Sequence, residues 1–310
     1  MKIYNIKLGT SLDISNINLA IGNFDGIHLG HQKIIKELIN NSKKNQTHPA
    51  VLSFDPHPRQ FFSGNYENFN IISENSKIYF LEKLGVEYYF SLKFDHSIAS
   101  LAPRKFIKKI LIDQLKINYL VVGFNFKFGK DRLGDVHLLQ DQSTNYNFSI
   151  KVIHPVKFNS TSEVFSSSLI RKNIQTGNFE KVNTWLGRNW SMSGTVVPGD
   201  KRAGKINFPT ANIIPSNLIH PKRGVYAVRI KIGKNLFNGV ANFGKRPTVD
   251  GTKLLLEVHL FDFDENIYGK DLTVEFLTFI RDEKKFENFA LLTKQIHTDI
   301  QIAKDYHSKK

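Results

Sequence analysis

The first half of the chain alternates short apolar runs with segments in which apolar residues recur every three or four positions. Apolar runs of this length are typical of strands buried on both faces, and the longer spacing is typical of helices that cover such strands. The strand pattern occurs at residues 2–6, 17–21, 50–54, 86–92 and 119–123, and the helical pattern occurs at residues 31–39, 74–84 and 103–111. This alternation predicts an α/β domain built on a parallel, doubly wound sheet.

The pattern changes near residue 188. Apolar segments now follow one another with Gly and Pro turns between them, at residues 224–232, 236–244, 254–263 and 273–280. A helical stripe then closes the chain, formed by Phe289, Leu292, Ile296 and Ile300. Five or six short strands and a closing helix predict a small antiparallel β-barrel. We therefore expect two domains, residues 1–187 and residues 188–310.

The amino-acid composition of the chain excludes several classes of function. The hydrophobic fraction of 41% and the charged fraction of 23% are those of a soluble globular protein. No apolar run is long enough to span a bilayer and no basic-then-apolar leader begins the chain, so we expect a cytoplasmic protein without a membrane partner. The absence of cysteine excludes disulfides and thiolate catalysis. The net charge of +15 comes from scattered pairs of basic residues, which favours small anionic ligands over nucleic acid.

The densest group of candidate functional residues lies at residues 21–31, between a predicted strand and a predicted helix. Gly22 and Gly26 permit a tight turn and a close approach of the backbone to a ligand. The helix directs its free N–H groups and the positive end of its dipole at whatever binds there, which favours phosphate. His28 and His31 share a face of the first helical turn, so both can meet one polyphosphate. Zinc is disfavoured, because no third ligand lies nearby in the sequence.

Three further segments carry side chains that suit a ligand. Residues 55–59 follow the strand at 50–54, at the edge of an α/β sheet where ligands bind, although a plain surface turn has the same composition. Residues 123–135 combine glycine, aromatic rings that can stack on a planar base and cations that can meet phosphate; a surface loop is the alternative. Residues 166–171 start a helix with three serines, whose hydroxyls and Arg171 can also hold phosphate.

Several segments are similar to motifs of one family. Residues 22–31 read Gly-Asn-Phe-Asp-Gly-Ile-His-Leu-Gly-His and resemble the extended His-x-Gly-His signature of bacterial bifunctional riboflavin kinase/FAD synthetases, which belong to the nucleotidyltransferase superfamily. Residues 123–129 resemble the family's Gly-Phe-(Asn/Asp)-Phe-x-Phe-Gly motif, and residues 166–171 resemble its Ser-Ser-Thr-x-Ile-Arg motif with serine in place of threonine. Phe-Pro-Thr-Ala-Asn-Ile at 208–213 and Glu-x-His-x-x-Asp-Phe at 257–263 resemble riboflavin kinases.

The resemblance implies a Rossmann-like nucleotidyltransferase domain followed by a riboflavin kinase barrel. It implies that the protein phosphorylates riboflavin to FMN and then adenylylates FMN to FAD with release of pyrophosphate. ATP would be the co-substrate and Mg²⁺ the cofactor. The partners would be riboflavin, FMN, FAD and ATP, with no nucleic acid, and the oligomeric state stays open.

The resemblance also implies roles for individual residues. The catalytic residues would be His28, His31 and Glu257. ATP in the adenylyl transfer would contact Gly22, Phe24, Asp25, Gly26, His28, Gly30, His31, Ser166, Ser167, Ser168 and Arg171. The flavin would contact Asp55, Pro56, His57, Asn125, Phe126 and Phe128. ATP in the kinase would contact Gly199, Lys201, Pro209, Thr210 and Asn212, with Thr210 and Asn212 also binding the metal.

The two reactions need different chemistry. The phosphate of FMN is ionised at neutral pH, so adenylyl transfer needs orientation and charge neutralisation rather than a base. The nucleophile of the kinase is a neutral hydroxyl, which benefits from a carboxylate base. We expect Glu257 to supply it, from the strand face opposite to Leu254, Leu256, Val258 and Leu260.

Three alternatives stay open at this point. A nucleic-acid-binding protein would use the positive charge and would not need His28 or Glu257. A transferase could act on a different acceptor, although the C-terminal motifs argue against it. A single-activity enzyme could arise because Asn207 stands where riboflavin kinases usually have glycine. Asparagine tolerates positive φ better than most residues, which favours survival of that loop.

Overall fold

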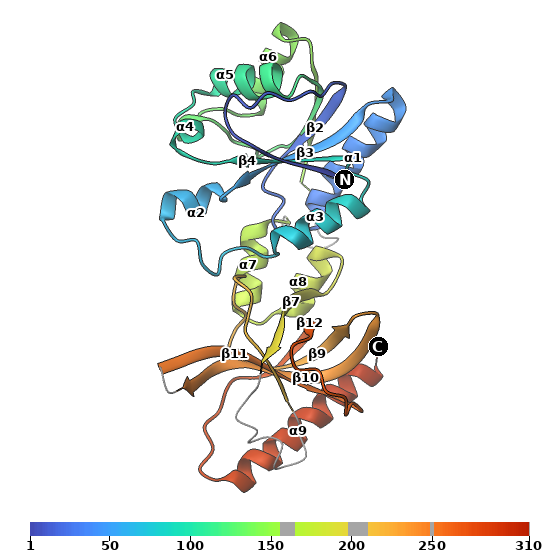
Figure 1. The fold of residues 1–310 in the computed structure, drawn as a ribbon, viewed down its shortest axis with the longest axis vertical. Coiled ribbons are helices and arrows are strands. Elements are labelled where there is room, and N and C mark those ends of the chain that lie inside the picture. The colour runs from blue at the N-terminus through green and yellow to red at the C-terminus, as the bar shows by residue number, and fades with distance from the viewer. Residues whose placement is uncertain (156–164, 198–209, 249–250, 310) are drawn as a thin grey trace. The chain divides into compact units, whose positions relative to one another are not determined.

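The computed structural model describes residues 1–155, 165–197, 210–248 and 251–309. The chain divides into two compact units, Met1–Ser167 and Ser168–Lys310 (Figure 1). Each unit has its own sheet, and each is described separately below. No helix in the described part of the chain is both long and apolar enough to cross a membrane.

The first unit contains a six-stranded parallel sheet with the strand order β1-β4-β3-β2-β5-β6. The parallel, doubly wound sheet expected from the sequence is therefore confirmed. Its strands are β1 (Lys2–Ile6), β2 (Ile17–Ile21), β3 (His48–Asp55), β4 (Tyr88–Lys93), β5 (Ile117–Gly123) and β6 (Ser149–Ile153). Strand β1 lies at the edge, as expected, and β2 lies between β3 and β5, where the order of the strands along the sheet reverses.

Helices cover both faces of this sheet; Figure 1 shows α5 and α6 on one side and α3 on the other. The helical segments are α1 (Leu29–Asn45), α2 (Pro58–Ser63), α3 (Glu74–Lys83), α4 (His96–Ala99), α5 (Pro103–Phe106), the π-helical η1 (Ile107–Gln114), the 3₁₀ turn η2 (Lys130–Arg132) and α6 (Val136–Asn145). The helices predicted at 31–39 and 74–84 are confirmed. The third is also helical, but it changes from α to π geometry after Phe106.

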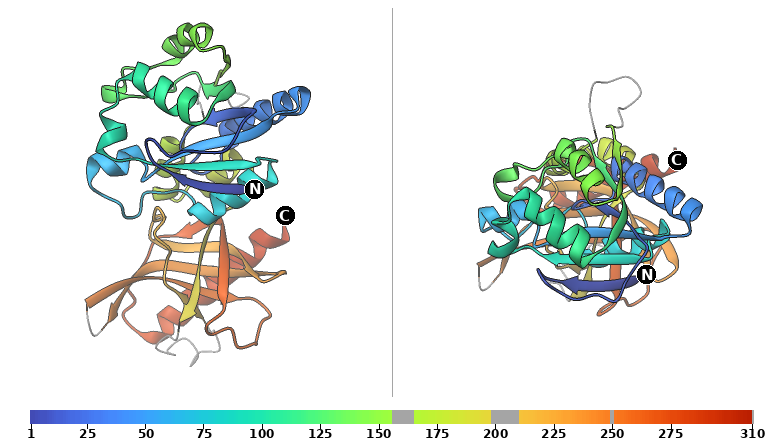
Figure 2. Two further views of the ribbon diagram at one scale, coloured as in Figure 1. Left: turned by 45° about the horizontal axis from the view of Figure 1, so that its top comes forward. Right: turned by 90° about the horizontal axis from the view of Figure 1, so that it is seen from above.

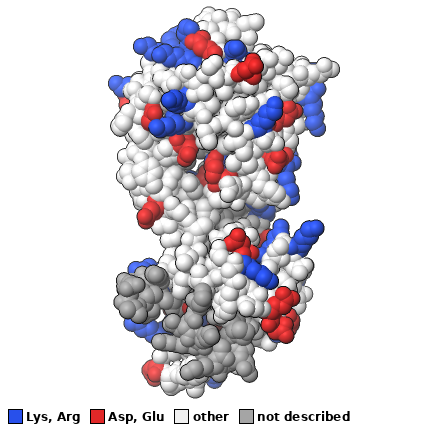
Figure 3. Space-filling view, viewed as in Figure 1, with Lys and Arg blue, Asp and Glu red and all other residues white. Residues whose placement is uncertain are grey.

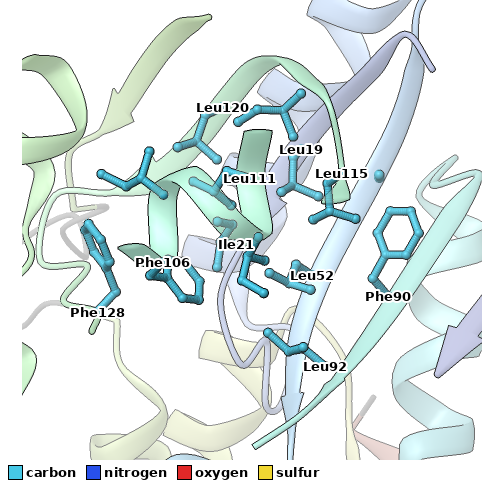
Figure 4. Close-up of a cluster of buried hydrophobic side chains, with 14 of the residues drawn as sticks. Leu19, Ile21, Leu52, Phe90, Leu92, Phe106, Leu111, Leu115, Leu120 and Phe128 are labelled. Carbon is cyan, nitrogen blue, oxygen red and sulfur yellow. The ribbon is translucent and has the colours of Figure 1, made fainter. Parts of the chain in front are cut away.

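The core of the first unit lies between the sheet and helices α5 and η1. Leu19, Leu52 and Leu120 project from neighbouring strands and pack against Leu111 and Phe106 (Figure 4). All five side chains are almost completely buried. Since every second residue of these strands faces this core, the register of the central strands is fixed by burial. The carboxyl ends of β2, β3 and β5 therefore meet at one edge of the sheet.

The sequence pattern missed part of this unit. Helix α6 and strand β6 carry fewer buried residues than the central elements, so their apolar periodicity is weak. Helix α6 begins at a local signal instead, because the side chain of Asp135 accepts a hydrogen bond from the N–H of Leu138 at 3.1 Å. The segment expected as a loop at 55–59 is shorter, since α2 already begins at Pro58.

The second unit is a closed antiparallel barrel with the order β10-β11-β8-β7-β12-β9. The barrel expected from the sequence is confirmed. Its strands are β7 (Trp190–Val197), β8 (Ala211–Ile213), β9 (Gly224–Ile232), β10 (Asn235–Thr248), β11 (Gly251–Leu260) and β12 (Asp271–Arg281). Helices α7 (Ser167–Gln175) and α8 (Phe179–Leu186) precede the barrel, and α9 (Phe289–Ser308) follows it. Phe179 of α8 stacks on Phe276 of the barrel with ring centroids 5.1 Å apart.

Helix α9 packs along the barrel strands β9 and β10 (Figure 2). Ala303 is completely buried and Ile300 packs beside it. Phe289 is 53% exposed, so the expected apolar stripe is wrong at its first position: the helix has only begun there. A bidentate ion pair joins α9 to β12, with Arg281 Nε and Nη2 donating to the carboxylate of Asp299 at 2.8 and 2.7 Å. Gln295 donates to the same carboxylate.

We expect the Asp299→Asn substitution to destabilise the second unit by about 3 kcal/mol, because the guanidinium of Arg281 loses its carboxylate in a largely buried site. Both tryptophans of the chain, Trp185 and Trp190, are buried in this unit. Urea unfolding followed by tryptophan fluorescence therefore reports on it. Asp305→Asn changes an exposed carboxylate of the same helix and should stay within about 0.5 kcal/mol of the wild type. Equal unfolding midpoints for both variants would contradict this account.

Candidate active sites

The turn that follows β2 occupies the ligand-binding position of an open α/β sheet. Ligands of such sheets bind outside the carboxyl ends of the strands, at the point where the strand order reverses. That point here is β2, between β3 and β5, and residues 22–28 leave its carboxyl end. The segment predicted as a nucleotide site from its glycines and histidines therefore lies where this fold binds its ligands.

Two non-glycine residues of this turn adopt left-handed backbone conformations. Phe24 has φ +48° and Ile27 has φ +39°, while Gly26 has φ +88°. Such values are energetically costly for residues with a side chain, and more so for the β-branched Ile27. Both side chains are 1% exposed, so their burial in the interior holds the turn in this shape. The packing of these two side chains therefore offsets the cost of the left-handed backbone conformations.

His28 and His31 lie against each other, as their spacing predicts. The two rings stack with centroids 3.6 Å apart, and the ring of Phe24 contacts His31 edge-on at 5.2 Å. His28 caps helix α1, because its Nδ1 accepts the N–H of His31 at 3.3 Å. The accepting role of Nδ1 places the proton of the neutral ring on Nε2.

Gly30 lies close to the ring of His28. A Cβ atom at position 30 would lie 3.1 Å from the Nδ1 and Cε1 atoms of that ring. Gly22 has a similar relation to Phe24, whose ring would lie 3.3 Å from an added Cβ. Both glycines were expected near ATP, and in the structure each makes room for a side chain of the turn.

Asp25 and Ser167 were also expected to contact ATP, and both hold the turn in place. The carboxylate of Asp25 is 3% exposed and accepts the N–H groups of Ile71 and Ile72 at 2.9 and 3.3 Å. The hydroxyl of Ser167 donates to the backbone carbonyl of Asp25 at 2.9 Å. These two side chains therefore position the loop from inside the protein.

The remaining serine-rich residues differ in exposure. Ser166 is half-buried, Ser168 is exposed and Arg171 is 8% exposed. Helix α7 begins at Ser167, as the serine run predicts. Its first residue ends the first compact unit and the rest of the helix belongs to the second.

The residues expected to contact flavin follow β3 and β5. Asp55 is the last residue of β3 and lies at the surface. The pKa of its carboxyl is raised, first because neighbouring atoms partly shield that group from water and second because of the charge of Glu74. His57 caps α2 by accepting the N–H of Arg59 at 3.0 Å. Asn125 follows β5 and is exposed. Pro56 lies between Asp55 and His57 and is half-buried.

The aromatic residues after β5 lie deeper than a stacking platform would require. Phe128 is 5% exposed and packs against Phe106 with ring centroids 5.5 Å apart. Phe126 stacks on Phe128 at 5.6 Å and is half-buried. Phe128 therefore belongs to the core, and Phe126 retains more exposed surface for a ligand.

The sequence analysis missed a polar network at the same edge of the sheet. Lys77 of α3 contacts Ser53 of β3 and Glu74, and the hydroxyl of Tyr89 of β4 donates to Glu74. Burial, followed by the nearby Glu74, raises the pKa of Tyr89. Lys77 is followed four residues later by the buried Leu81, so helical spacing alone already places it on the inner face.

The second unit brings three polar residues together across neighbouring strands. Glu257 of β11 lies opposite Asn212 of β8 on one side and opposite Asn242 of β10 on the other. Residues in direct register project from the same face of a sheet, so these side chains are neighbours. Asn212 is 8% exposed, and Glu257 and Asn242 are half-buried.

The strand pattern predicted for β11 is confirmed at its centre. Leu256, Val258 and Leu260 are buried, and Leu254 near the strand's start is half-buried. Thr210 is half-buried and stands two positions before Asn212, the spacing at which extended residues share a face. Gly199, Lys201, Asn207 and Pro209 lie outside the described residues.

Charge is distributed without a continuous basic stripe on the face of the molecule shown in Figure 3, where Lys and Arg alternate with Asp and Glu. Among the described residues, no cluster of three or more His, Cys, Asp or Glu side chains could hold a metal ion.

Two family models cover most of the chain. Residues 11–169 match the model described as FAD synthetase, and residues 186–307 match the model described as riboflavin kinase. The first contains the turn after β2, and the second contains the residues around Glu257.

Whole proteins and a solved structure are similar over almost the entire length. The bifunctional riboflavin kinase/FMN adenylyltransferase of Haemophilus influenzae is 39% identical over 93% of each chain, and that of Escherichia coli is 34% identical over 93% of this chain and 92% of its own. A crystal structure titled as a macrolide-efflux protein from Streptococcus pneumoniae is 27% identical, with a TM-score of 0.89 over 98% of this chain and 99% of that chain. By its two domains and these relatives, the chain belongs to the family of bifunctional riboflavin kinase/FMN adenylyltransferases.

Proposed function

We propose that the barrel unit phosphorylates riboflavin to FMN, that the parallel-sheet unit converts FMN to FAD, and that the residues described above carry these reactions. The observation that carries this proposal is the presence of one polar site in each unit, of opposite chemical character. The first presents donors from a histidine pair and a helix start, and the second presents a carboxylate between two asparagines. ATP is the co-substrate of both steps.

In the adenylyl transfer, an oxygen of the FMN phosphate attacks the α-phosphorus of ATP, and the bond to the bridging oxygen of pyrophosphate breaks. The nucleophile is already ionised, so no proton is removed from it. His28, His31 and the positive end of the α1 dipole would neutralise the charge that grows on the α-phosphate and on the leaving group. Each well-placed donor contributes about 2–4 kcal/mol. Ser166, which belongs to the same unit, would contact the same nucleotide.

The flavin of this step would lie beside the loops that follow β3 and β5. Asp55, Pro56 and His57 leave one strand end, and the exposed Asn125 leaves another at the same edge of the sheet. Phe126 offers an aromatic surface beside Asn125. The phosphate of FMN would then point towards the turn after β2, where the histidines lie.

In the kinase step, the terminal ribityl hydroxyl of riboflavin attacks the γ-phosphorus of ATP, and ADP leaves. Glu257 accepts the proton of that hydroxyl. Its neighbours Asn212 and Asn242 carry amide groups that can hold the carboxylate and the substrate in place.

The donor set of the barrel fits Mg²⁺. The amide oxygen of Asn212 and the hydroxyl of Thr210 stand two positions apart and are the kind of oxygen ligand that Mg²⁺ prefers, so these two residues would hold the ion. When bound, Mg²⁺ neutralises charge on the β- and γ-phosphates. Thr210 and Asn212 would hold it beside Glu257.

The cellular setting follows from the same chemistry. We place the protein in the cytoplasm with small-molecule partners and without nucleic acid or membrane, because its basic residues are scattered among acidic ones. We also place the domain boundary at residues 187 and 188, which is later than the division into compact units after Ser167 and assigns helix α8 to the first domain. The match to the riboflavin kinase model, which begins at residue 186, supports that boundary.

We expect His31→Ala to lower the rate of FAD formation from FMN and ATP at least about a hundredfold, because one donor to the nucleotide phosphates is lost. Formation of FMN from riboflavin should be unchanged. Chromatographic separation of riboflavin, FMN and FAD measures both rates in one sample. His137→Ala, an exposed histidine of α6, is the control. FAD formation at the wild-type rate in the His31 variant would contradict the assignment.

Glu257→Gln should have the opposite effect on the two activities. Phosphorylation of riboflavin should fall about a hundredfold or more through kcat, because the amide cannot take the proton of the hydroxyl. Added FMN should still become FAD at the wild-type rate. Glu265→Gln changes an exposed glutamate of the same unit and should alter neither rate. A kinase with full activity in the Glu257 variant would exclude this residue as the base.

Asn212→Ala should raise the Mg²⁺ concentration needed for half-maximal kinase activity by about tenfold, because one oxygen ligand is lost. The Mg²⁺ dependence of FAD formation from FMN should not change in the same variant. A Mg²⁺ titration at constant ATP, with free Mg²⁺ controlled, measures both. Asn238→Ala is the control, since Asn238 is an exposed asparagine of β10. An unchanged Mg²⁺ dependence would remove Asn212 from the metal site.

A further inference from the structure

Lys77 is the only lysine of the described residues that the structure buries, with 9% of its surface exposed. A buried ammonium is costly unless hydrogen-bonding partners replace its water. Its Nζ lies 2.8 Å from Glu74 Oε2, on the same helix, and 3.4 Å from Ser53 Oγ, on β3. The hydroxyl of Tyr89, on β4, donates to the other oxygen of Glu74. Lys77 therefore joins α3 to β3 through Ser53, and Glu74 joins the same helix to β4 through Tyr89.

This hydrogen-bond network ends at the turn after β2. The hydroxyl of Ser53 donates to the backbone carbonyl of Asn23 at 3.2 Å. Asn23 stands between Gly22 and Phe24, at the point where the strained backbone begins. With its own hydrogen directed at that carbonyl, Ser53 accepts from Lys77 through its lone pairs. The ammonium of Lys77 thus acts on the turn through a single intervening hydroxyl.

A second link joins the same two parts of the chain. The N–H groups of Ile71 and Ile72 donate to the carboxylate of Asp25, two residues after Asn23. Ser73 follows directly and caps α3, which carries Glu74 and Lys77 in its first turn. Residues 71–77 therefore hold the turn at two positions, through Asp25 and through Asn23.

We propose that Lys77 is a positioning residue for adenylyl transfer, which acts through Ser53 on the turn that presents His28 and the start of α1. The inference rests on the proposed function of that turn. General stability does not require a lysine here: Glu74 is 46% exposed at its side chain and can be solvated without Lys77, and an apolar side chain of similar length fits a buried position well. The ammonium is needed to fix the hydroxyl of Ser53 and, through it, the carbonyl of Asn23.

Steady-state kinetics of the full-length protein test this proposal, with the kinase activity of the same chain as an internal measure of folding. Lys77→Met should lower kcat for FAD formation from FMN and ATP about tenfold or more, with KM for FMN within about threefold and riboflavin phosphorylation unchanged. Lys77→Arg retains a donor and should recover part of the loss. Lys83→Met changes an exposed lysine of the same helix and should have no effect.

Substitutions of Ser53 test the same proposal with a smaller change of side chain than Lys77→Met. Ser53→Ala should lower kcat in the same way, and Ser53→Thr, which keeps the hydroxyl, should retain most of the activity. Because Lys77 and Ser53 act in series, the double variant Lys77→Met/Ser53→Ala should lose no more than the worse single variant. Independent, multiplying losses would overturn the proposal, and so would full activity in both single variants.

Amide hydrogen exchange separates this inference from the proposed function. In Lys77→Met, peptides covering residues 22–31 should exchange faster than in the wild type, whereas peptides from β5 should not change. If the wild type makes no FAD, the proposed function of the first unit fails, but the exchange result still decides the positioning role. Unchanged exchange at residues 22–31 would overturn it. Loss of protection throughout the first unit would do so as well, because Lys77 would then support the fold as a whole.

Discussion

The geometry of the proposed adenylyl-transfer site depends on one backbone turn that is held in an unfavourable conformation. Phe24 and Ile27 have positive φ, and their side chains are buried, so relaxing the backbone would expose both to water. The carboxylate of Asp25 fastens the same turn to Ile71 and Ile72. The buried carboxylate of Asp25 thus stabilises the conformation of the turn. The residues proposed to contact the nucleotide follow this turn, at the start of helix α1.

In the barrel, the register of the strands determines where the polar side chains lie. In a β-sheet the side-chain period is two, so a shift of one residue would move Glu257 to the apolar interior side of the strand. Burial of Leu256 and Val258 on the opposite face prevents that shift. Once the register is fixed, Asn212 and Asn242 are the neighbours of Glu257 on either side. Core packing therefore places this carboxylate, just as it fixes the turn after β2.

Much of this arrangement could be predicted from the sequence, because it depends on local patterns. The buried strands, the glycine-rich turn, the helical pattern at residues 31–39 and the face of Glu257 each follow from a few neighbouring residues. Contacts between distant residues could not be predicted in this way. Lys77 contacts a strand more than twenty residues earlier in the chain, and Asn242 meets Glu257 only after the strands pair. The aromatic ring of Phe128 is suited to stacking on a planar ligand, yet its packing against Phe106 buries it.

The opposite character of the two sites explains why they occupy separate folding units. The adenylyl site needs donors and positive potential, because both of its substrates are anionic. A helix start at the edge of a parallel sheet supplies these from the backbone itself. The kinase site needs an anionic base beside an anionic nucleotide, and a strand can hold that base between neutral amides without an adjoining helix dipole. If His28 and Glu257 act as proposed, a carboxylate placed beside His28 would weaken the potential available for ATP, and a helix start beside Glu257 would lower the basicity of its carboxylate. Combining both reactions in one chain therefore favours two sites over one.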